Sequence, residues 1–252
     1  MQEQFQWCGY TWGPAMEHGR IIHSDFPWYW YSDGTIMDVG NDTLELGIRR
    51  NPRDVRHWNG KTYHPTIEAA TMRSREDFSF GTFSAEIMLP DGKGLWPSFW
   101  LTGSGNWPPE IDIMEAWSGN GCYFKLFIAQ PPYFRPSWRT TTNVHYLDET
   151  MEHDSVGSRN IPYTKQRKNP EENFVRYECE WLPDSITFRA DGKDVRKVTG
   201  DVCRKLTENI KDPEKGFRMN AMFNVWCENP ETHNVTMRTP MAIRDFRYVP
   251  FE

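Results

Sequence analysis

Apolar and polar side chains alternate with a period of two along much of this chain, and no other feature of the sequence constrains its fold as strongly. Residues 83–89 read FSAEIML, so every second residue from Phe83 to Leu89 is apolar and lies on one face of an extended chain. The run ends at residues 90–94, PDGKG, which are typical turn residues. Short alternating runs separated by turns indicate antiparallel sheets with one buried face.

The last third of the chain repeats this pattern. Residues 175–181 alternate, residues 186–190 predict a second strand, and Asp191-Gly192 is a strong hairpin signal into a third. Residues 243–249 predict a final strand, and their charges favour a position at the edge of a sheet. Helical periodicity is nearly absent, and residues 202–210 are the stretch that could form a helix.

A strand near the C-terminus indicates a groove. In residues 217–226 one parity is apolar, whereas the other includes Asn224 and ends at Trp226. A polar face with a tryptophan suits the lining of a wet groove, and the alternative is an ordinary solvated face. No repeat or linker interrupts the chain, so we expect residues 1–252 to form a single all-β domain. The strand pattern predicts a sandwich of two antiparallel sheets with an open concave cleft.

Composition excludes several classes of protein. The net charge of -6 gives no basic field for nucleic acid, and no apolar run is long enough to span a membrane. The five cysteines are scattered without a CxxC pair, so we expect no metal site, no cofactor and no required disulfide framework. The first seven residues lack the features of a signal peptide. Aromatic residues reach 15% of the chain, which predicts exposed rings in the groove.

The candidate chemistry lies in residues 110–115, which read EIDIME. On a regular strand Glu110 and Asp112 share one face, whereas Glu115 points to the opposite, apolar side. Burying an unpaired carboxylate there would be costly. A single β-bulge between Asp112 and Glu115 would reverse the parity and bring all three acids to one face.

The spacing of the two glutamates suits a retaining glycosidase. With the bulge, their Cα atoms are roughly 13 Å apart at ~3.3 Å per strand step, so the side chains can bring their carboxyls to about 5 Å. Retaining enzymes need ~5–5.5 Å and inverting enzymes ~6.5–9.5 Å. One glutamate would then attack the sugar while the other acts as acid and base, with Asp112 between them. The alternative is a solvated acidic edge strand, against which the neighbouring Trp107 and Trp117 argue.

The motif EIDIME resembles the E-x-D-x-x-E signature of glycoside hydrolase family 16 in its β-bulge form. Residues 80–87 and 94–101 are similar to the strand pair that precedes the signature in that family, and residues 177–193 resemble a later hairpin. The resemblance covers roughly residues 70–250, whereas residues 1–69 match poorly. It implies a β-jelly-roll sandwich with an open substrate cleft.

The resemblance also implies roles for individual residues. Glu110 corresponds to the nucleophile, Asp112 to its assistant and Glu115 to the acid/base. His145 resembles a histidine on the neighbouring strand that contacts the aspartate. Trp96 and Trp100 match a tryptophan-rich strand, and their alternative is core packing. The predicted substrate-binding residues are Trp96, Trp100, Trp117, His145, Asn224, Trp226, Arg135 and Arg139.

Residues 124–142 are longer than a simple hairpin and carry Arg135 and Arg139. Guanidinium groups match the oxygens of sulfate or carboxylate, so this segment could bind an anionic glycan. The alternative is a surface loop with ordinary solvated charges.

The sequence therefore predicts a retaining endo-β-glycosidase. Residues 94–101 resemble the laminarinase-like version best, which favours β-1,3-glucan as the substrate. Agar, porphyran, carrageenan or a host-type β-galactan is the alternative, followed by transglycosylation and by glycan binding without catalysis. We expect a monomer that is secreted, periplasmic or on the cell surface, with a polysaccharide as its partner.

Overall fold

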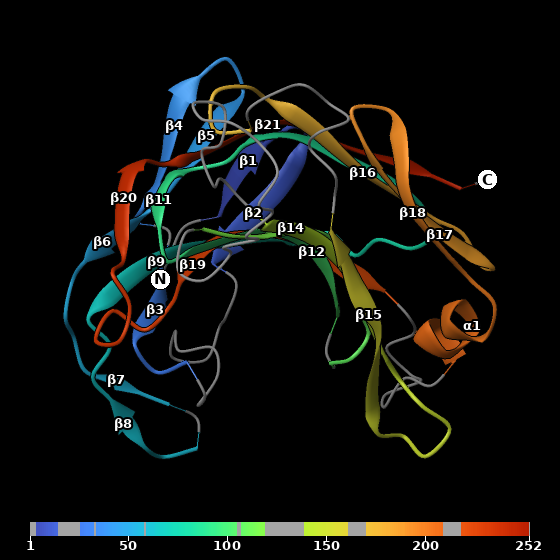
Figure 1. Ribbon diagram of the computed structural model, residues 1–252, viewed down its shortest axis with the longest axis horizontal. Coiled ribbons are helices and arrows are strands. Elements are labelled where there is room, and N and C mark those ends of the chain that lie inside the picture. The colour runs from blue at the N-terminus through green and yellow to red at the C-terminus, as the bar shows by residue number, and fades with distance from the viewer. Residues whose placement is uncertain are drawn as a thin grey trace, which may run out of the picture.

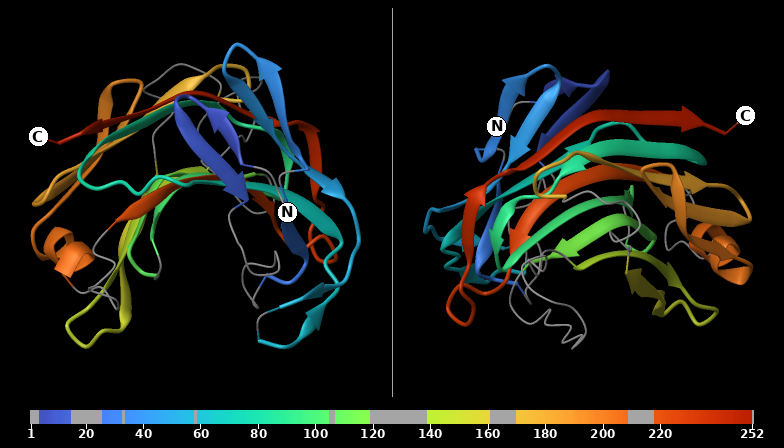
Figure 2. Two further views of the ribbon diagram at one scale, coloured as in Figure 1. Left: turned by 180° about the vertical axis from the view of Figure 1, so that it is seen from behind. Right: turned by 45° about the horizontal axis from the view of Figure 1, so that its top comes forward.

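The computed structural model describes residues 4–14, 26–32, 34–57, 59–104, 107–118, 139–160, 170–208 and 218–251. Two large sheets stack on each other, and both curve in the same sense (Figures 1 and 2). Within the described residues the inner sheet has ten strands in the order β1-β2-β9-β19-β12-β13-β14-β15, with β3 and β6 also paired to β9. Its strands are β1 (Phe5–Trp7), β2 (Tyr10–Pro14), β3 (Tyr29–Ser32), β6 (Ile48–Arg50), β9 (Ile67–Ser74), β12 (Leu95–Gly103), β13 (Glu110–Trp117), β14 (Arg139–Leu147), β15 (His153–Asn160) and β19 (Met219–Cys227).

The outer sheet has seven described strands in the order β18-β17-β16-β10-β21-β5-β4. They are β18 (Lys193–Thr199), β17 (Ser185–Ala190), β16 (Val175–Trp181), β10 (Gly81–Met88), β21 (Met241–Pro250), β5 (Thr43–Leu46) and β4 (Ile36–Gly40). The described residues also form two two-stranded sheets: β11 (Asp91–Lys93) with β20 (Thr236–Thr239), and β7 (Val55–Arg56) with β8 (Thr62–Tyr63). Apart from the parallel pair β3–β9, the described pairs are antiparallel, so the predicted all-β jelly-roll sandwich is confirmed.

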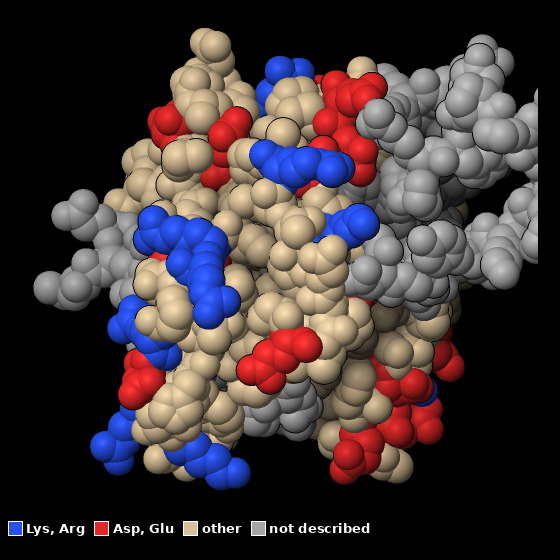
Figure 3. Space-filling model, turned by 60° about the vertical axis from the view of Figure 1, so that its left-hand side comes forward, with Lys and Arg blue, Asp and Glu red and all other residues tan. Residues whose placement is uncertain are grey.

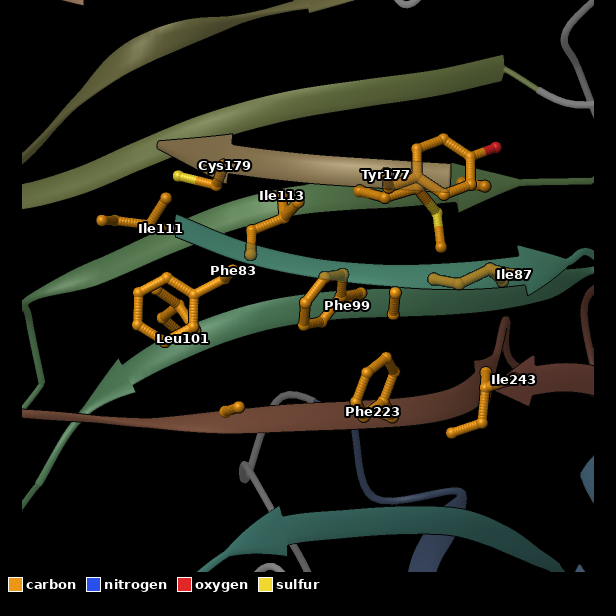
Figure 4. Close-up of a cluster of buried hydrophobic side chains, with 14 of the residues drawn as sticks. Phe83, Ile87, Phe99, Leu101, Ile111, Ile113, Tyr177, Cys179, Phe223 and Ile243 are labelled. Carbon is orange, nitrogen blue, oxygen red and sulfur yellow. The ribbon is translucent and has the colours of Figure 1, made fainter. Parts of the chain in front are cut away.

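The core lies between the two sheets and follows the predicted alternation. From the outer sheet, Phe83 and Ile87 are fully buried on one face of β10. From the inner sheet, Phe99 and Phe223 stack with their ring centroids 4.5 Å apart (Figure 4). Ile113, in the acidic stretch 110–115, also points into this layer. The back of the acidic strand is therefore held by a close-packed core, which fixes its register.

The expectation of one polar, wet face on the strand around residues 217–226 is wrong for most of its length. All nine residues of β19 are buried. Arg73 of the neighbouring β9 donates to Asn220 Oδ1 at 2.9 Å, and Trp100 of β12 donates to Asn224 Oδ1 at 2.7 Å. Because long side chains from both neighbouring strands cover this face, only Trp226 at its end lines the cleft.

The final strand is not an edge. β21 lies between β10 and β5, and Met241–Ile243 pair with β5 while most of the strand pairs with β10. Its charges are paired laterally on the outer sheet: Arg244 Nε is 2.7 Å from Glu86 Oε2, and Asp245 pairs with Arg176. Charged residues predicted an edge because lone charges avoid sheet centres, but cross-strand partners remove that cost.

One helix occurs in the described residues, α1 (Asp201–Glu208), which agrees with the predicted stretch 202–210 as far as that stretch is described. Cys203 and Leu206 anchor it to the sandwich. In the part of the chain that the structure covers, no helix has the length and apolar character needed to cross a membrane.

Candidate active site

The bulge predicted in the acidic strand is present. On the β14 side the register of β13 shifts between Asp112 and Glu115, and on the β12 side Trp100 pairs with Asp112 while Phe99 pairs with Met114. Ile113 is thus the extra residue, and Ile113 and Met114 are both buried. All three acids face the concave side of the inner sheet.

A cleft of about 630 Å³ lies over this strand on the concave face. Of the predicted residues, the three acids line it together with Trp96, Trp100, Trp117, His145 and Trp226. Asn224 does not line it, Arg135 lies outside the described residues, and the side chain of Arg139 is likewise not described. Tyr31, in an aromatic stretch at residues 28–31 that could build cleft loops, also lines it, and the lining residues that the sequence did not predict are Phe26, Ser98, Thr102, Trp107, Asn143 and His153.

Glu110, at the start of β13, has an indole donor at its carboxylate and an imidazole close to it. Trp107 Nε1 donates to Glu110 Oε2 at 2.9 Å, and His145 Nε2 lies 3.4 Å from Glu110 Oε1. The Trp107 ring is half exposed, at 47%. Trp107 entered the sequence reasoning only as an apolar flank of the motif, although its position three residues before Glu110 was the available signal.

Asp112 is the most buried of the three acids, with 3% of its surface exposed. His145 Nε2 lies 3.3 Å from Asp112 Oδ2, so one imidazole nitrogen faces both Asp112 and Glu110. His145 comes from β14, where it pairs directly with Glu110 across the two strands. The predicted contact between His145 and the aspartate is therefore present.

Glu115 lies beyond the bulge, next to the tryptophans. Trp96 Nε1 donates to Glu115 Oε1 at 3.2 Å, and Trp96 stacks on Trp117 with ring centroids 5.7 Å apart and planes 26° apart. Glu115 also shares a hydrogen bond with Asp112 that raises the pKa of Glu115 and lowers that of Asp112, as expected when Glu115 donates.

The electrostatic environment of the cleft favours the protonated forms of its three carboxyl groups. Burial, followed by the charge of Asp112, raises the pKa of Glu110 and of Glu115 well above the usual range. Burial raises the pKa of Asp112 to about 7. Three carboxyls in one cleft cannot all ionise at neutral pH. Since Glu110 receives the Trp107 N–H and faces His145, whereas Glu115 donates to Asp112, negative charge is favoured on Glu110 and a proton on Glu115.

The aromatic floor of the cleft is held from below. Asn224 accepts from Trp100 Nε1 and donates to the main-chain oxygen of Trp96 at 3.3 Å. Trp226 donates to Thr71 Oγ1 at 3.1 Å and packs against Tyr29 with centroids 5.8 Å apart. The prediction that Asn224 contacts substrate is corrected in this respect: its side chain is fully buried, and it orients Trp100 instead.

In the described part of the chain, Glu110, Asp112 and His145 offer three ligand atoms within 4.8 Å of one another. These are the same carboxylates and imidazole that the sequence predicts for acid–base chemistry. That the protein uses no metal and no cofactor stays a prediction.

An open, tryptophan-floored cleft with three acids on the concave sheet of a jelly roll defines a class of carbohydrate-active β-sandwich. The family model described as glycosyl hydrolases family 16 matches residues 23–239. The chain belongs to this family, and the family predicted from the motif is confirmed.

The chain is similar to one curated relative and to two solved structures of known proteins. The chain is 26% identical over 188 residues to a beta-glucanase of Rhodothermus marinus, covering 71% of this chain and 54% of that protein, so it spans about half the length of this curated relative. Its fold is similar to porphyranase B of Zobellia galactanivorans, with a TM-score of 0.66, 18% identity and coverage of 98% and 89% of the two chains. A Bacteroides ovatus mixed linkage glucan family 16 protein gives a TM-score of 0.64, 17% identity and 99% coverage of both chains.

Proposed function

We propose that this chain is a retaining endo-β-glycanase in which Glu110 is the nucleophile and Glu115 the acid/base. The observation that carries the proposal is the contrast between the two glutamates on one bulged strand. Glu110 accepts from Trp107 and faces His145, whereas Glu115 hands a hydrogen bond to Asp112. Two carboxyls whose surroundings favour opposite protonation states match the roles of nucleophile and acid.

The reaction would proceed in two displacements. Glu110 attacks the anomeric carbon as the glycosidic C–O bond breaks, and Glu115 gives its proton to the departing oxygen. The sugar is then esterified to Glu110. Glu115, now ionised, takes a proton from water as the water oxygen attacks the anomeric carbon and the Glu110 carboxylate leaves. Asp112 supports the first step, because its charge and hydrogen bond hold the proton on Glu115 until the departing oxygen takes it.

We infer that the substrate is a neutral β-glucan, with β-1,3-glucan favoured. Stacked Trp96 and Trp117 offer a flat apolar face beside Glu115, which suits a sugar ring, and the Rhodothermus marinus relative is a beta-glucanase. A β-galactan is the second candidate, favoured by the fold similarity to a porphyranase. Transglycosylation uses the same residues, with a sugar hydroxyl in place of water.

A substrate panel separates these candidates. Laminarin, lichenan, agarose, porphyran, carrageenan and keratan-type glycans are incubated with the enzyme, and the products are measured by mass. The expected result is a ladder of oligosaccharides from laminarin. Cleavage confined to the galactans would replace the glucan proposal, and products larger than the substrate would indicate transglycosylation.

The catalytic assignment has its own test. Glu110→Gln and Glu115→Gln should each lower kcat by at least about 10³-fold while glycan binding persists, because each change removes a group that forms or breaks bonds in the mechanism. Glu45→Gln, on β5 outside the cleft, is the control. Near-full activity of either cleft variant would remove the assignment, and glycan binding without cleavage by the unmodified chain would favour a binding protein.

The domain organisation, the oligomeric state and the location of the protein remain predictions. The chain is expected to act as one catalytic domain, as a monomer, and outside the cytoplasm where polysaccharide is available. Light scattering after size-exclusion chromatography tests the monomer against the mass of 29.8 kDa.

A further inference from the structure

A second histidine extends the site toward the exposed strand β15. His153 Nε2 lies 2.9 Å from His145 Nδ1, and the two rings stack with centroids 5.2 Å apart. The pairing register places His145 opposite Ser155 and His153 opposite Leu147, so the two histidines are diagonal neighbours on one face of the β14–β15 hairpin. His145 is therefore held between the acids at Nε2 and a second imidazole at Nδ1.

The surrounding hydrogen bonds define where the His145 proton lies. Asn143 Oδ1 accepts the Val144 N–H at 2.9 Å, which turns the Asn143 amide nitrogen toward His145 Nε2 at 3.0 Å. An amide nitrogen can only donate, so His145 Nε2 accepts from it. A neutral His145 then carries its proton on Nδ1 and donates it to His153 Nε2.

His153 suits the role of acceptor. An imidazole nitrogen accepts only when it carries no proton, so His153 must be neutral with its proton on Nδ1. Burial, followed by the charge of His145, lowers the pKa of His153, which favours this neutral form. The ring is also fixed in place, because Trp107 packs against it with centroids 4.7 Å apart.

We propose that His153 is a positioning residue that fixes the proton of His145 on Nδ1 and so makes Nε2 an acceptor on the side of Asn143, Glu110 and Asp112. This inference rests on the function proposed above. Besides the Asn143 amide, this lone pair faces Asp112 Oδ2, which is buried, makes no hydrogen bond among the described residues and lies 3.3 Å away. A protonated Asp112 Oδ2 can therefore donate a hydrogen bond to His145 Nε2.

The opposite tautomer would change the site. With its proton on Nε2, a neutral His145 would point an N–H at the Asn143 amide and could no longer take the proton of Asp112. Asp112 would then have no acceptor at His145 for its proton while Glu115 acts as acid and base. His153 prevents this by offering the Nδ1 proton a better partner than water.

Two substitutions distinguish the effect of the hydrogen-bond acceptor of His153 from the effect of its aromatic ring. His153→Phe keeps an aromatic ring beside Trp107 but offers no acceptor, whereas His153→Gln keeps a side-chain acceptor without the ring. His64→Phe is the matched control, because His64 is exposed, at 73%, and does not line the cleft. Thermal unfolding checks that each full-length variant folds.

The tautomer is measured directly by proton–nitrogen NMR correlation of the histidine rings at pH 8, with the His145 signals identified by their loss in His145→Gln. The expected result is a protonated Nδ1 in the unmodified protein, in His153→Gln and in His64→Phe, and proton transfer to Nε2 in His153→Phe. An unmodified protein with the proton on Nε2, or an unchanged pattern in His153→Phe, would overturn the proposal.

Kinetics supply the second readout. His153→Phe should lower kcat by up to about tenfold, the effect of losing one neutral hydrogen bond, with KM within about twofold. His153→Gln should restore most of kcat. If Gln loses as much as Phe, the ring and not the acceptor matters, and the proposal is wrong. If the unmodified chain cleaves no glycan, the proposed function fails, while the NMR result still decides the role of His153.

Discussion

Among single residues, the site brings together three acids that cannot all be ionised at neutral pH. Asp112 carries the clearest consequence, because burial raises its pKa to about 7 and its Oδ2 faces His145 Nε2. An acid with a raised pKa in the folded state binds more protons folded than unfolded, so the folded state loses stability as pH rises through that value. Catalytic arrangement and stability therefore oppose each other at this position.

Asp112→Asn should stabilise the fold at alkaline pH. The amide carries no charge, so the penalty that the carboxylate incurs between its unfolded pKa near 4 and about 7 is removed. We expect a gain of roughly 1–3 kcal/mol in the free energy of unfolding at pH 8 and little change at pH 4. Urea unfolding at both pH values measures it. A variant less stable at pH 8 than the unmodified protein would contradict this account of Asp112.

Two tryptophans should control opposite limbs of the pH–activity profile. Trp107→Phe removes a donor from ionised Glu110, which raises the pKa of the nucleophile and moves the acidic limb to higher pH. Trp96→Phe removes a donor from Glu115, which raises the pKa of the acid and moves the basic limb to higher pH. Profiles of kcat/KM for both variants test the assignment. If Trp107→Phe moves the basic limb instead, the two glutamates have been given the wrong roles.

At the scale of elements, the single extra residue in β13 decides the chemistry. Parity in the sequence required it, since a regular strand would drive Glu115 into the core. The structure places it at Ile113. The back of the strand is packed against Phe99 and its neighbours, so the register cannot slip to accommodate a change.

Deleting Ile113 should therefore leave all three acids on the cleft face. The strand regains regular alternation, Glu115 becomes the second residue after Asp112 and still faces the cleft, and kcat should fall far less than in Glu115→Gln. Ile113→Val is the matched control, which keeps the bulge and should cost about 0.5–1.5 kcal/mol while retaining activity. A deletion variant that folds but is as inactive as Glu115→Gln would contradict this account of strand parity.

The same scale shows what sequence could predict. Strands with one buried face, such as β10 and β16, follow from alternation, and the motif of β13 follows from parity and the family resemblance. β19 and β21 were misjudged because polar residues there are paired by side chains from distant strands: Asn220 by Arg73, and Arg244 by Glu86. His153 was missed for a similar reason, because its place in the cleft depends on the β14–β15 register. The spacing of His145 and His153 around a turn at 148–152 was nevertheless a usable signal.

At the scale of the whole molecule, charge is unevenly distributed. The net charge is -6, yet Figure 3 shows Lys and Arg gathered on the side of the molecule that carries β6 to β8. Exposed Arg50, Arg53 and Arg56 come from one short segment, and Arg53 lies over the Trp30 ring at 4.5 Å. A neutral glucan makes no use of this basic strip, whereas a sulfated galactan could.

Replacing Arg50, Arg53 and Arg56 together by Gln tests the choice of substrate. For laminarin, kcat/KM should stay within about twofold, because a neutral polymer offers no anionic oxygen to the strip. The measurement is made at low and at physiological salt, with carrageenan binding in parallel. A loss for laminarin of tenfold or more would contradict a neutral substrate that bypasses this surface.

In the proposed mechanism the acids of the bulged strand act by double displacement. Proton NMR of the first product formed from a defined β-linked oligosaccharide reads the configuration at the new reducing end before it equilibrates. Retention, with the β-anomer appearing first, is the predicted result. If the α-anomer appears first, water attacks directly, and Glu110 is not the nucleophile.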